Sequence, residues 1–333
     1  MVFPFYHFPW ALRSCYFLCC QWILHTFKLR KTQELAGFFA KRFFRIYPPY
    51  LVAVLFFAYF SPYCNLDWIR EESHGKVLLQ HLFMVNNYRD GLGMVLNPSF
   101  WSVATEIQLY LLYPAVVFLC ARLGWDLTLL ILLVLEVGLR TIEATNGHLH
   151  GLSMSPFKFW FSWTVGAYVC QKYLDGQKCI FSDQSIIFWA ALCVFAKFLG
   201  VLEPFGFTFA AVATAVFVSK RLDGKIHFNL PKTICSIVTK FGIYSYGIYL
   251  LHQPFFWFAH YMEVQTTPRL NSRLETWFSV SISGKAVTFF WCVLISIAVY
   301  FLSALFYRLV EKPSVSLGNW IIRIFDSRKS LKN

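Results

Sequence analysis

The sequence predicts an all-α, polytopic integral membrane protein. Of its 333 residues, 57% are hydrophobic, 20% are aromatic and only 14% are charged. A soluble domain averages about 45–50% apolar and about 25% charged residues. The apolar residues also fall into long runs, as transmembrane helices of roughly 20 residues require. No stretch offers a polar module large enough to fold alone, so residues 1–333 are expected to form a single transmembrane domain.

Apolar runs predict about nine membrane-spanning helices. A further apolar stretch, residues 76–88, is too short to cross and is expected to pack near one surface. The nine predicted spans are residues 10–27, 47–63, 99–121, 125–141, 155–173, 185–201, 204–219, 241–262 and 286–307.

Basic residues predict the orientation in the membrane. The chain has 30 basic and 17 acidic residues, and six bases lie in 28–46, five in 220–240 and six in 308–333. Cytoplasmic loops of membrane proteins are enriched in Lys and Arg. These loops and the C-terminus are therefore expected in the cytosol, with the protein in the plasma (inner) membrane. The same loops explain the net charge of +13 more simply than nucleic-acid binding.

The N-terminus does not fit this count easily. Nine crossings with a cytosolic C-terminus place it outside, although the chain starts MVFPFYHFPW with neither a basic region nor a convincing cleavage site. Either the N-terminus lies outside, or a first helix is missing from this chain.

The stretch FFAKRFFRIYPPYL, residues 38–51, combines aromatic and basic side chains. Arg42 and Arg45 are three residues apart and share a helical face. Pro48 and Pro49 suit the start of the following span. One interpretation is an ordinary positive-inside anchor with an aromatic belt. The other is a guanidinium pair that binds phosphates at the cytosolic surface.

Glu106 lies within a stretch otherwise typical of a membrane span. An acid near the centre of a span costs about 2.5–3.5 kcal/mol on insertion scales, so it usually faces a cavity or a partner. Trp101, Gln108 and Tyr110 are close enough in sequence to hydrogen-bond it. Glu106 is either a structural carboxylate paired with a base from another helix or part of a functional site.

Two more stretches carry polar side chains in or next to spans. In FGIYSYGIYLLHQPFFWF, residues 241–258, His252 follows Ser245 at mid-span. Such a histidine is either a satisfied core residue or a proton-transfer group. The stretch FYRLVEKPSVSLG, residues 306–318, is by itself typical of an interfacial anchor.

Two pairs of side chains have simpler interpretations. Glu136 has Arg140 four residues on, which predicts an ion pair on one helix. His148 and His150 provide only two ligands, fewer than the three or four of a zinc site. The cysteines lie mostly in apolar runs without a CxxC spacing, so no metal or disulfide framework is expected.

The order of four motifs resembles the acyltransferase 3 family of membrane O-acyltransferases. The chain carries R-I-Y-P-P-Y, then W-S-x-x-x-E-x-Q-x-Y-L-x-Y-P, then S-Y-x-I-Y-L-x-H-x-P, and finally Y-R-x-x-E-K-P. The similarity covers about residues 18–318. The resemblance implies ten spans, of which the first carries an arginine and, eleven residues later, a catalytic histidine. His7 matches this histidine, while the arginine would precede Met1, so the first helix is expected to be truncated.

The resemblance implies transfer of an acyl group, most simply acetyl, from acyl-CoA to a hydroxyl of a carbohydrate or glycolipid. Acyl-CoA would be a substrate, with no permanently bound cofactor. His7 would be the general base or acyl relay and Glu106 would assist it, with Arg42 and Arg45 at the donor phosphates. Trp101, Tyr110, Ser245 and His252 would line the acceptor side. The alternative is a degenerate, non-enzymatic homologue that acts as a carrier or proton-coupled transporter through Glu106 and His252.

Overall fold

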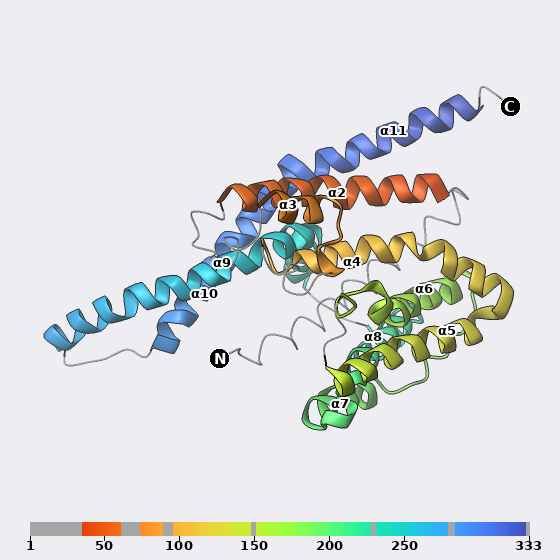
Figure 1. The fold of residues 1–333 in the computed structure, drawn as a ribbon, viewed down its shortest axis with the longest axis horizontal. Helices are drawn as coiled ribbons and strands as arrows, with labels where there is room; N and C mark the ends of the chain where they lie inside the picture. Colours follow the sequence, from red (N-terminus) through yellow and green to blue (C-terminus); the bar gives the residue numbers. More distant parts are fainter. Residues whose placement is uncertain are drawn as a thin grey trace. The chain divides into compact units, whose positions relative to one another are not determined.

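The computed structural model describes residues 35–60, 74–88, 96–147, 151–227, 231–278 and 284–330, and every regular element among them is a helix (Figure 1). The α-helices are α2 (Leu35–Phe60), α3 (His74–Leu82), α4 (Phe100–Leu111), α5 (Tyr113–Asn146), α6 (Trp160–Leu174), α7 (Ile186–Phe198), α8 (Gly206–Leu222), α9 (Lys232–Phe278), α10 (Gly284–Phe306) and α11 (Lys312–Ser330). Three short 3₁₀ helices are η4 (Asn86–Tyr88), η6 (Pro156–Phe159) and η7 (Gly200–Phe205), and η8 (Tyr307–Glu311) is a π-helix.

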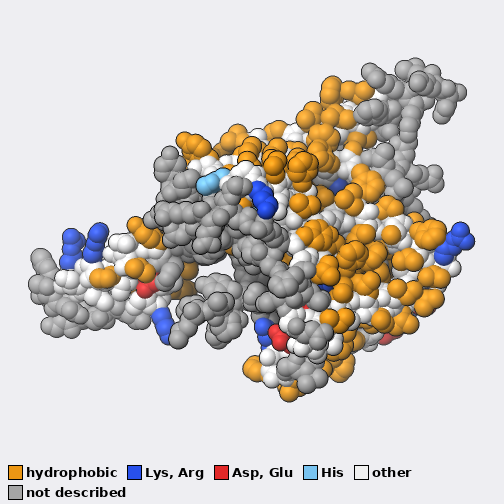
Figure 2. Space-filling model, viewed as in Figure 1, with side chains coloured by type: hydrophobic (Ala, Val, Ile, Leu, Met, Phe, Trp, Pro, Cys, Tyr) orange, Lys and Arg blue, Asp and Glu red, His pale blue; other side chains and the backbone are white. Residues whose placement is uncertain are grey.

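Several of these helices are long and apolar enough to cross a bilayer, which confirms the predicted fold class. Within the described ranges five helical stretches satisfy both criteria: Gly37–Phe60, Tyr113–Thr145, Leu202–Leu222, Lys232–Phe255 and Gly284–Ile324. Many of their large hydrophobic side chains are exposed, and hydrophobic side chains cover much of the visible surface (Figure 2). Such surfaces suit contact with lipid chains, so the protein is an integral membrane protein.

The predicted spans and the observed helices differ in length. Span 10–27 lies outside the described residues. The predicted spans 155–173 and 185–201 correspond to α6 and α7, which have only 15 and 13 residues. In the stretch 76–88, α3 has nine residues and is too short to cross, as expected.

The chain divides into two compact units, which are described separately. The first unit is Met1–Phe38, Met84–Asp90 and Trp101–Asn229, and the second is Phe39–Phe83, Gly91–Phe100 and Leu230–Asn333.

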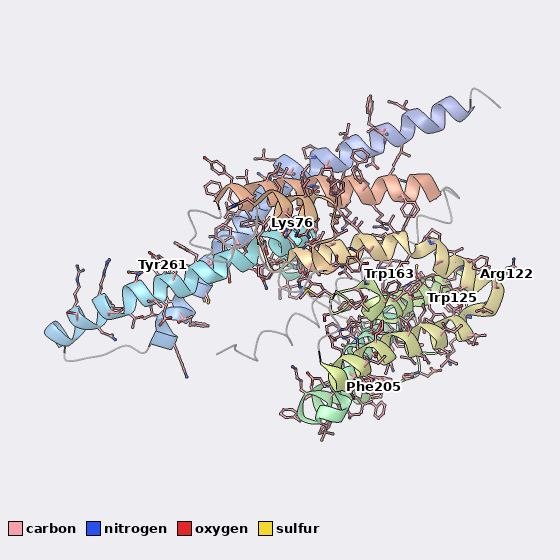
Figure 3. The ribbon with its side chains drawn as sticks, viewed as in Figure 1. Lys76, Arg122, Trp125, Trp163, Phe205 and Tyr261 are labelled. Carbon is pink, nitrogen blue, oxygen red and sulfur yellow. The ribbon has the colours of Figure 1, made fainter. Side chains whose placement is uncertain are left out.

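In the first unit, α6 forms the centre. Its residues from Trp160 to Cys170 are all buried, because the helix is apolar around its whole circumference. It packs against α5 and α8, and α8 also packs against α7. Trp163, labelled in Figure 3, is fully buried.

A single glycine turns the chain between two spans of the first unit. Gly124 has φ 75° and ψ 171°, a conformation that a residue with a Cβ rarely adopts. The ribbon reverses direction here (Figure 1), with Arg122 and Trp125 on either side of the turn (Figure 3). The predicted span 99–121 therefore corresponds to α4 together with the first part of α5. The predicted span 125–141 corresponds to the rest of α5.

In the second unit, α2 continues through its two prolines, so the prediction that Pro48 and Pro49 begin a helix was wrong. Both lie inside the helix that starts at Leu35. Proline has no N–H, so Pro48 leaves the carbonyl of Phe44 without its helical donor. The Ser314 hydroxyl donates to that carbonyl instead. A polar group of a neighbouring helix therefore replaces the missing bond, as membrane helices require.

Pro254 in α9 is accommodated in the same way. It removes the donor for the carbonyl of Leu250. The side-chain amide of Asn97 donates to that oxygen at 2.6 Å, and its own Oδ1 accepts from the N–H of Ser99 at 2.9 Å. Tyr246 of α9 also donates to the carbonyl of Ile46 in α2 at 2.9 Å. These bonds join α2, α9 and the segment before α4 within one unit.

Candidate functional site

Glu106 and Tyr110 form a buried polar pair on α4. Each is 3% exposed, and the Tyr110 hydroxyl donates to Glu106 Oε1 at 2.9 Å. Their spacing of four residues places both side chains on one face of the helix. The Tyr110 ring packs edge-on against Trp163, with ring centres 5.8 Å apart. The hydrogen bond predicted from the sequence is thus confirmed, and it lies beside aromatic rings.

Gln108, the other suggested partner of Glu106, binds elsewhere. Its amide donates to the carbonyl of Met84 at 2.8 Å and to Asn87 Oδ1 at 2.9 Å. Both amide hydrogens are therefore used, and the suggested bond to Glu106 was wrong. Trp101 packs its ring against Phe159, with centres 5.8 Å apart.

Asn87 holds α4 against two neighbouring loops, a role that no motif in the sequence indicates. Its Nδ2 lies 2.9 Å from Gln108 Oε1, 3.3 Å from Thr105 Oγ1 and 3.1 Å from the carbonyl of Met154. Thr105 also donates to Met154 at 2.9 Å. We call this set of groups the amide network. It consists of Asn87, Thr105, Gln108 and the carbonyls of Met84 and Met154. Because Thr105 and Gln108 flank Glu106, the network fixes the rotation of α4 about its axis and therefore the direction of the carboxylate.

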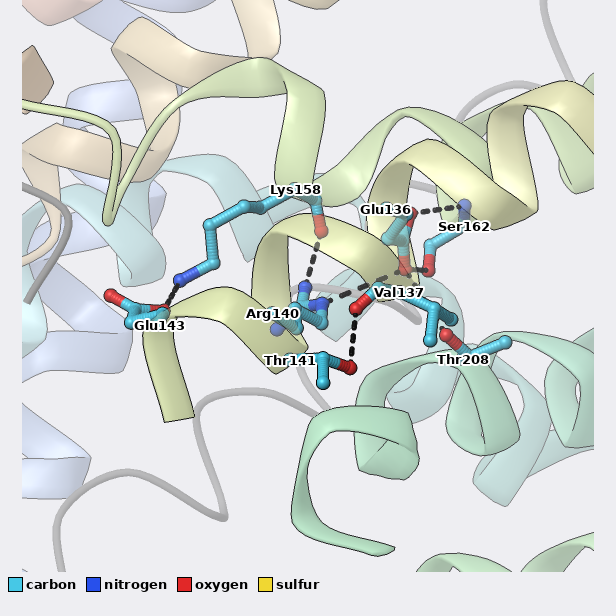
Figure 4. A network of polar contacts seen from close by, with 8 residues as sticks. All are labelled: Glu136, Val137, Arg140, Thr141, Glu143, Lys158, Ser162 and Thr208. Atoms are coloured by element: carbon cyan, nitrogen blue, oxygen red, sulfur yellow. Dashed lines mark hydrogen bonds and ion pairs between the residues drawn. The ribbon is translucent and has the colours of Figure 1, made fainter. Parts of the chain in front are cut away.

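The predicted ion pair of Glu136 and Arg140 is confirmed, with Arg140 Nε 3.8 Å from Glu136 Oε1 (Figure 4). Glu136 is fully buried. It also accepts hydrogen bonds from the Ser162 N–H at 2.9 Å, the Ser162 hydroxyl at 2.6 Å and Thr208 at 3.4 Å. A carboxylate with this many partners joins α5, α6 and α8 and is structural.

Arg140 belongs to the same structural network. Its guanidinium lies over the rings of Phe207 and Phe159, 4.2 Å and 5.0 Å from their centres, and donates to the carbonyl of Lys158. Lys158 in turn pairs with Glu143 (Figure 4). Two acids and two bases therefore neutralise one another in the first unit, which accounts for the burial of Glu136, Arg140 and Lys158.

Arg42 and Arg45 lie in the second unit, one turn apart on α2. Arg42 is 5% exposed, while Arg45 is partly exposed. The helical spacing predicted for the pair is thus present. Of the two, Arg45 is the more accessible to a bound anion.

His252 and Ser245 lie on α9, also in the second unit. His252 is 5% exposed, and its Nδ1 lies 2.8 Å from the carbonyl of Tyr249 and 3.1 Å from that of Ile248. A carbonyl only accepts, so Nδ1 carries the hydrogen and Nε2 of the neutral ring carries the lone pair. Ser245 donates to the carbonyl of Gly242 in its own helix at 2.8 Å.

His7, His148 and His150 lie outside the described residues, so their predicted roles stay predictions. Among the residues that are described, no group of three or more His, Cys, Asp or Glu side chains is arranged to hold a metal ion.

The chain was compared with models of known protein families. A family model described as an acyltransferase domain, of the acyltransferase 3 type, matches residues 14–308. Comparisons with curated proteins and with solved structures found no match. The matched range includes every motif from Arg42 to His252.

Proposed function

We propose that this chain, a membrane acyltransferase of the acyltransferase 3 family, acylates a hydroxyl of a carbohydrate or glycolipid. The donor in this proposal is acyl-CoA. The acyl group proposed is acetyl. The family match carries the proposal, and the buried Glu106 carboxylate beside Tyr110 supports it. The enzyme would lie in the plasma membrane with its C-terminus in the cytosol.

The chemistry requires a base. The acceptor oxygen attacks the thioester carbonyl, and the C–S bond breaks. CoA leaves as a thiolate and then takes up a proton. An alcohol has a pKa far above 7, so its proton must be removed as the new C–O bond forms. In this proposal His7 takes that proton and returns it to the leaving thiolate.

Glu106 would stabilise the positive charge that His7 gains in the transition state. A carboxylate suits this role when its direction is fixed before the reaction, because it then needs no reorganisation. The Tyr110 hydroxyl and the amide network provide that fixation. Trp101 and Tyr110 would contact the acceptor, as would Ser245 and His252.

Arg42 and Arg45 would bind the phosphates of the donor. A guanidinium binds phosphate through two parallel hydrogen bonds, which a lysine cannot reproduce. The greater accessibility of Arg45 favours it as the main contact.

The donor site is tested with two acetyl thioesters, of which only one carries phosphates. Acetyl-CoA carries the phosphates and the nucleotide, while acetyl-pantetheine has neither. Arg45→Lys should raise the KM for acetyl-CoA and leave the KM for acetyl-pantetheine unchanged. Lys232→Gln, at an exposed position on α9 away from the motifs, is the control. An equal KM for acetyl-CoA in the wild type and in Arg45→Lys and Arg42→Lys would refute the phosphate contact.

The role of Glu106 is tested in the full-length protein. Glu106→Gln keeps the shape of the side chain and an acceptor for Tyr110, so the protein should fold, but acyl transfer should be lost. Folding is measured by thermal unfolding in detergent, and transfer by release of free CoA thiol. A folded variant with wild-type transfer, or one that does not fold, would show that the carboxylate is not catalytic. Ion- or solute-coupled transport without CoA release from the wild type would instead favour a carrier.

A further inference from the structure

Asn86 is a buried side chain whose hydrogen-bonding groups are all unsatisfied. It lies in the 3₁₀ helix η4 of the first unit and is 0% exposed. Among the described residues, neither its Nδ2 nor its Oδ1 has a hydrogen-bond partner. A buried amide without partners raises the free energy of the folded protein, because water bonds the same group in the unfolded chain. Such a group in a folded protein requires an explanation, and packing of the fold does not provide one.

The next residue in the chain is an asparagine that does hold the fold together. Asn87 is also buried, but its Nδ2 lies 2.9 Å from Gln108 Oε1 and 3.1 Å from the carbonyl of Met154. It belongs to the amide network, which orients α4. Two residues of the same type therefore lie in the same short helix with similar burial, and only Asn87 is bonded within the fold. The difference indicates that Asn86 has another role.

The chain just before Asn86 is strained. Met84 has φ 54°, in the left-handed region that residues with a Cβ rarely adopt. Its side chain is buried, and its carbonyl accepts from the amide of Gln108 at 2.8 Å. The amide network therefore holds the strained conformation in place. Strain of this kind is concentrated at binding and catalytic sites, where the surrounding structure imposes it.

A second unsatisfied side chain lies in the segment that packs against η4. A methyl group on Gly151 would lie 2.8 Å from the carbonyl oxygen of Tyr88, so the two segments are in close contact. Ser155 follows in the same segment and is buried, and its Oγ has no partner among the described residues. Its side chain does not cap η6, although serine is a common N-cap. Unsatisfied hydrogen-bonding groups are thus found in both of the segments that the bond from Asn87 to Met154 joins.

The chemistry of the unsatisfied amide indicates the class of ligand. A carboxamide offers two N–H donors and an acceptor oxygen. A phosphate or an oxyanion only accepts hydrogen bonds and would leave Oδ1 unsatisfied, whereas a hydroxyl both donates and accepts. Neighbouring hydroxyls of a sugar can therefore satisfy both ends of the Asn86 amide. A buried amide also selects strongly for such a ligand, because an analogue without the hydroxyl leaves the amide unpaired.

We infer that Asn86 is a substrate-binding residue that hydrogen-bonds hydroxyls of the carbohydrate acceptor next to the one that is acylated. The inference rests on the proposed function. Asn86 is covered in this structure, so the acceptor reaches it by displacing the side chains that cover it. The unsatisfied amide raises the free energy of the covered state and therefore favours its exchange for the bound state.

The kinetic test compares two alcohols that both dissolve in membranes, with acetyl-CoA as the donor and the protein in lipid nanodiscs. Octyl glucoside presents a sugar with several hydroxyls, while 1-octanol presents one, so the wild type should use octyl glucoside with the higher kcat/KM. Asn86→Leu keeps a similar size without polar groups and should raise the KM for octyl glucoside on the order of ten-fold. Its kcat should change little, because a contact to a non-reacting hydroxyl binds the ground state and the transition state alike. The KM values for octanol and acetyl-CoA should stay unchanged.

Thermal unfolding provides a readout that does not depend on acyl transfer. Asn86→Leu removes no hydrogen bond among the described residues, so its unfolding temperature should equal or exceed that of the wild type. The matched control is Asn87→Leu, which breaks the amide network and should unfold at a lower temperature. If leucine does not fit and Asn86→Leu fails to fold, Asn86→Ala and Asn87→Ala replace the two variants in both measurements.

The results that would overturn the inference are distinct from a failure of the proposed function. An unchanged KM for octyl glucoside in the Asn86 variant would overturn it, as would an equal kcat/KM of the wild type for the two alcohols. A loss of stability as large as that of the Asn87 variant would show that the Asn86 amide is structural. If the wild type releases no CoA with either alcohol, that result counts against the proposed function, and the comparison of unfolding temperatures then decides the inference.

Discussion

Removal of the buried charge of Glu136 should destabilise the protein strongly. Glu136→Gln keeps the size of the side chain and one oxygen acceptor for Ser162, but it leaves Arg140 without its anion. Arg140 is 9% exposed, so water cannot replace the lost partner. The guanidinium keeps its bond to the carbonyl of Lys158 and its two aromatic contacts, which limits the loss.

The expected magnitude follows from these contacts. Two unit charges about 4 Å apart attract by about 4 kcal/mol at an effective dielectric constant of about 20, and the Glu136–Arg140 separation is 3.8 Å. Removal of one partner of a buried pair typically costs about 3–5 kcal/mol. We therefore expect Glu136→Gln to lower the free energy of unfolding by about 3–5 kcal/mol.

Replacement of both partners should restore most of this stability. In Glu136→Gln/Arg140→Met no unpaired charge remains, and a neutral or apolar replacement of a buried pair is often close to neutral. The free energy of unfolding is measured in mixed micelles for the wild type and for both single and double variants. A loss below about 1 kcal/mol in Glu136→Gln, or a double variant less stable than either single one, would refute the reasoning.

Three further predictions concern other parts of the chain. Tyr110→Phe removes the hydroxyl bound to Glu106 and should lower the free energy of unfolding by about 1.5–3 kcal/mol, the value of a hydrogen bond to a charged group; an unchanged value in the same micelle assay would contradict this. Burial lowers the pKa of His81 from 6.5 to about 4, so the unfolded chain takes up a proton that the folded chain does not, and stability should fall as the pH decreases from 6.5 to 4, by about 3 kcal/mol in total. His81→Gln should remove this slope, and an identical slope in both proteins would show that His81 is not its source. A reporter fused to Asn333 should be cytosolic, and an extracytoplasmic signal would reverse the orientation inferred from the basic loops.

Features that depend on neighbouring residues in the sequence could be predicted. Hydrophobic runs identified the helices, because transfer of apolar side chains into lipid depends mainly on composition. The bonds from Tyr110 to Glu106 and from Arg140 to Glu136 were predictable, since residues four apart on a helix face the same way.

Features that depend on contacts between distant segments could not be predicted. Pro48 lies inside α2 because the Ser314 hydroxyl replaces the hydrogen bond that the proline cannot make. Ser314 follows Phe44, whose carbonyl it binds, by 270 residues, so the sequence around the prolines predicts a helix start instead. The close packing of α11 on α2, where a methyl group on Gly318 would lie 2.6 Å from the Phe44 Cβ, depends in the same way on residues far apart in the sequence. The role of Gln108 was missed for the same reason, because its partners Asn87 and Met84 lie in a separate loop.

The amide network also determines how acid and alkali act on the Glu106 region. Asn87, Gln108 and Thr105 have no group that gains or loses a proton in the usual range, and the carbonyls of Met84 and Met154 have none either. The support of α4 should therefore keep its geometry when the pH changes. An inflection in a curve of kcat against pH would then come from groups other than this network.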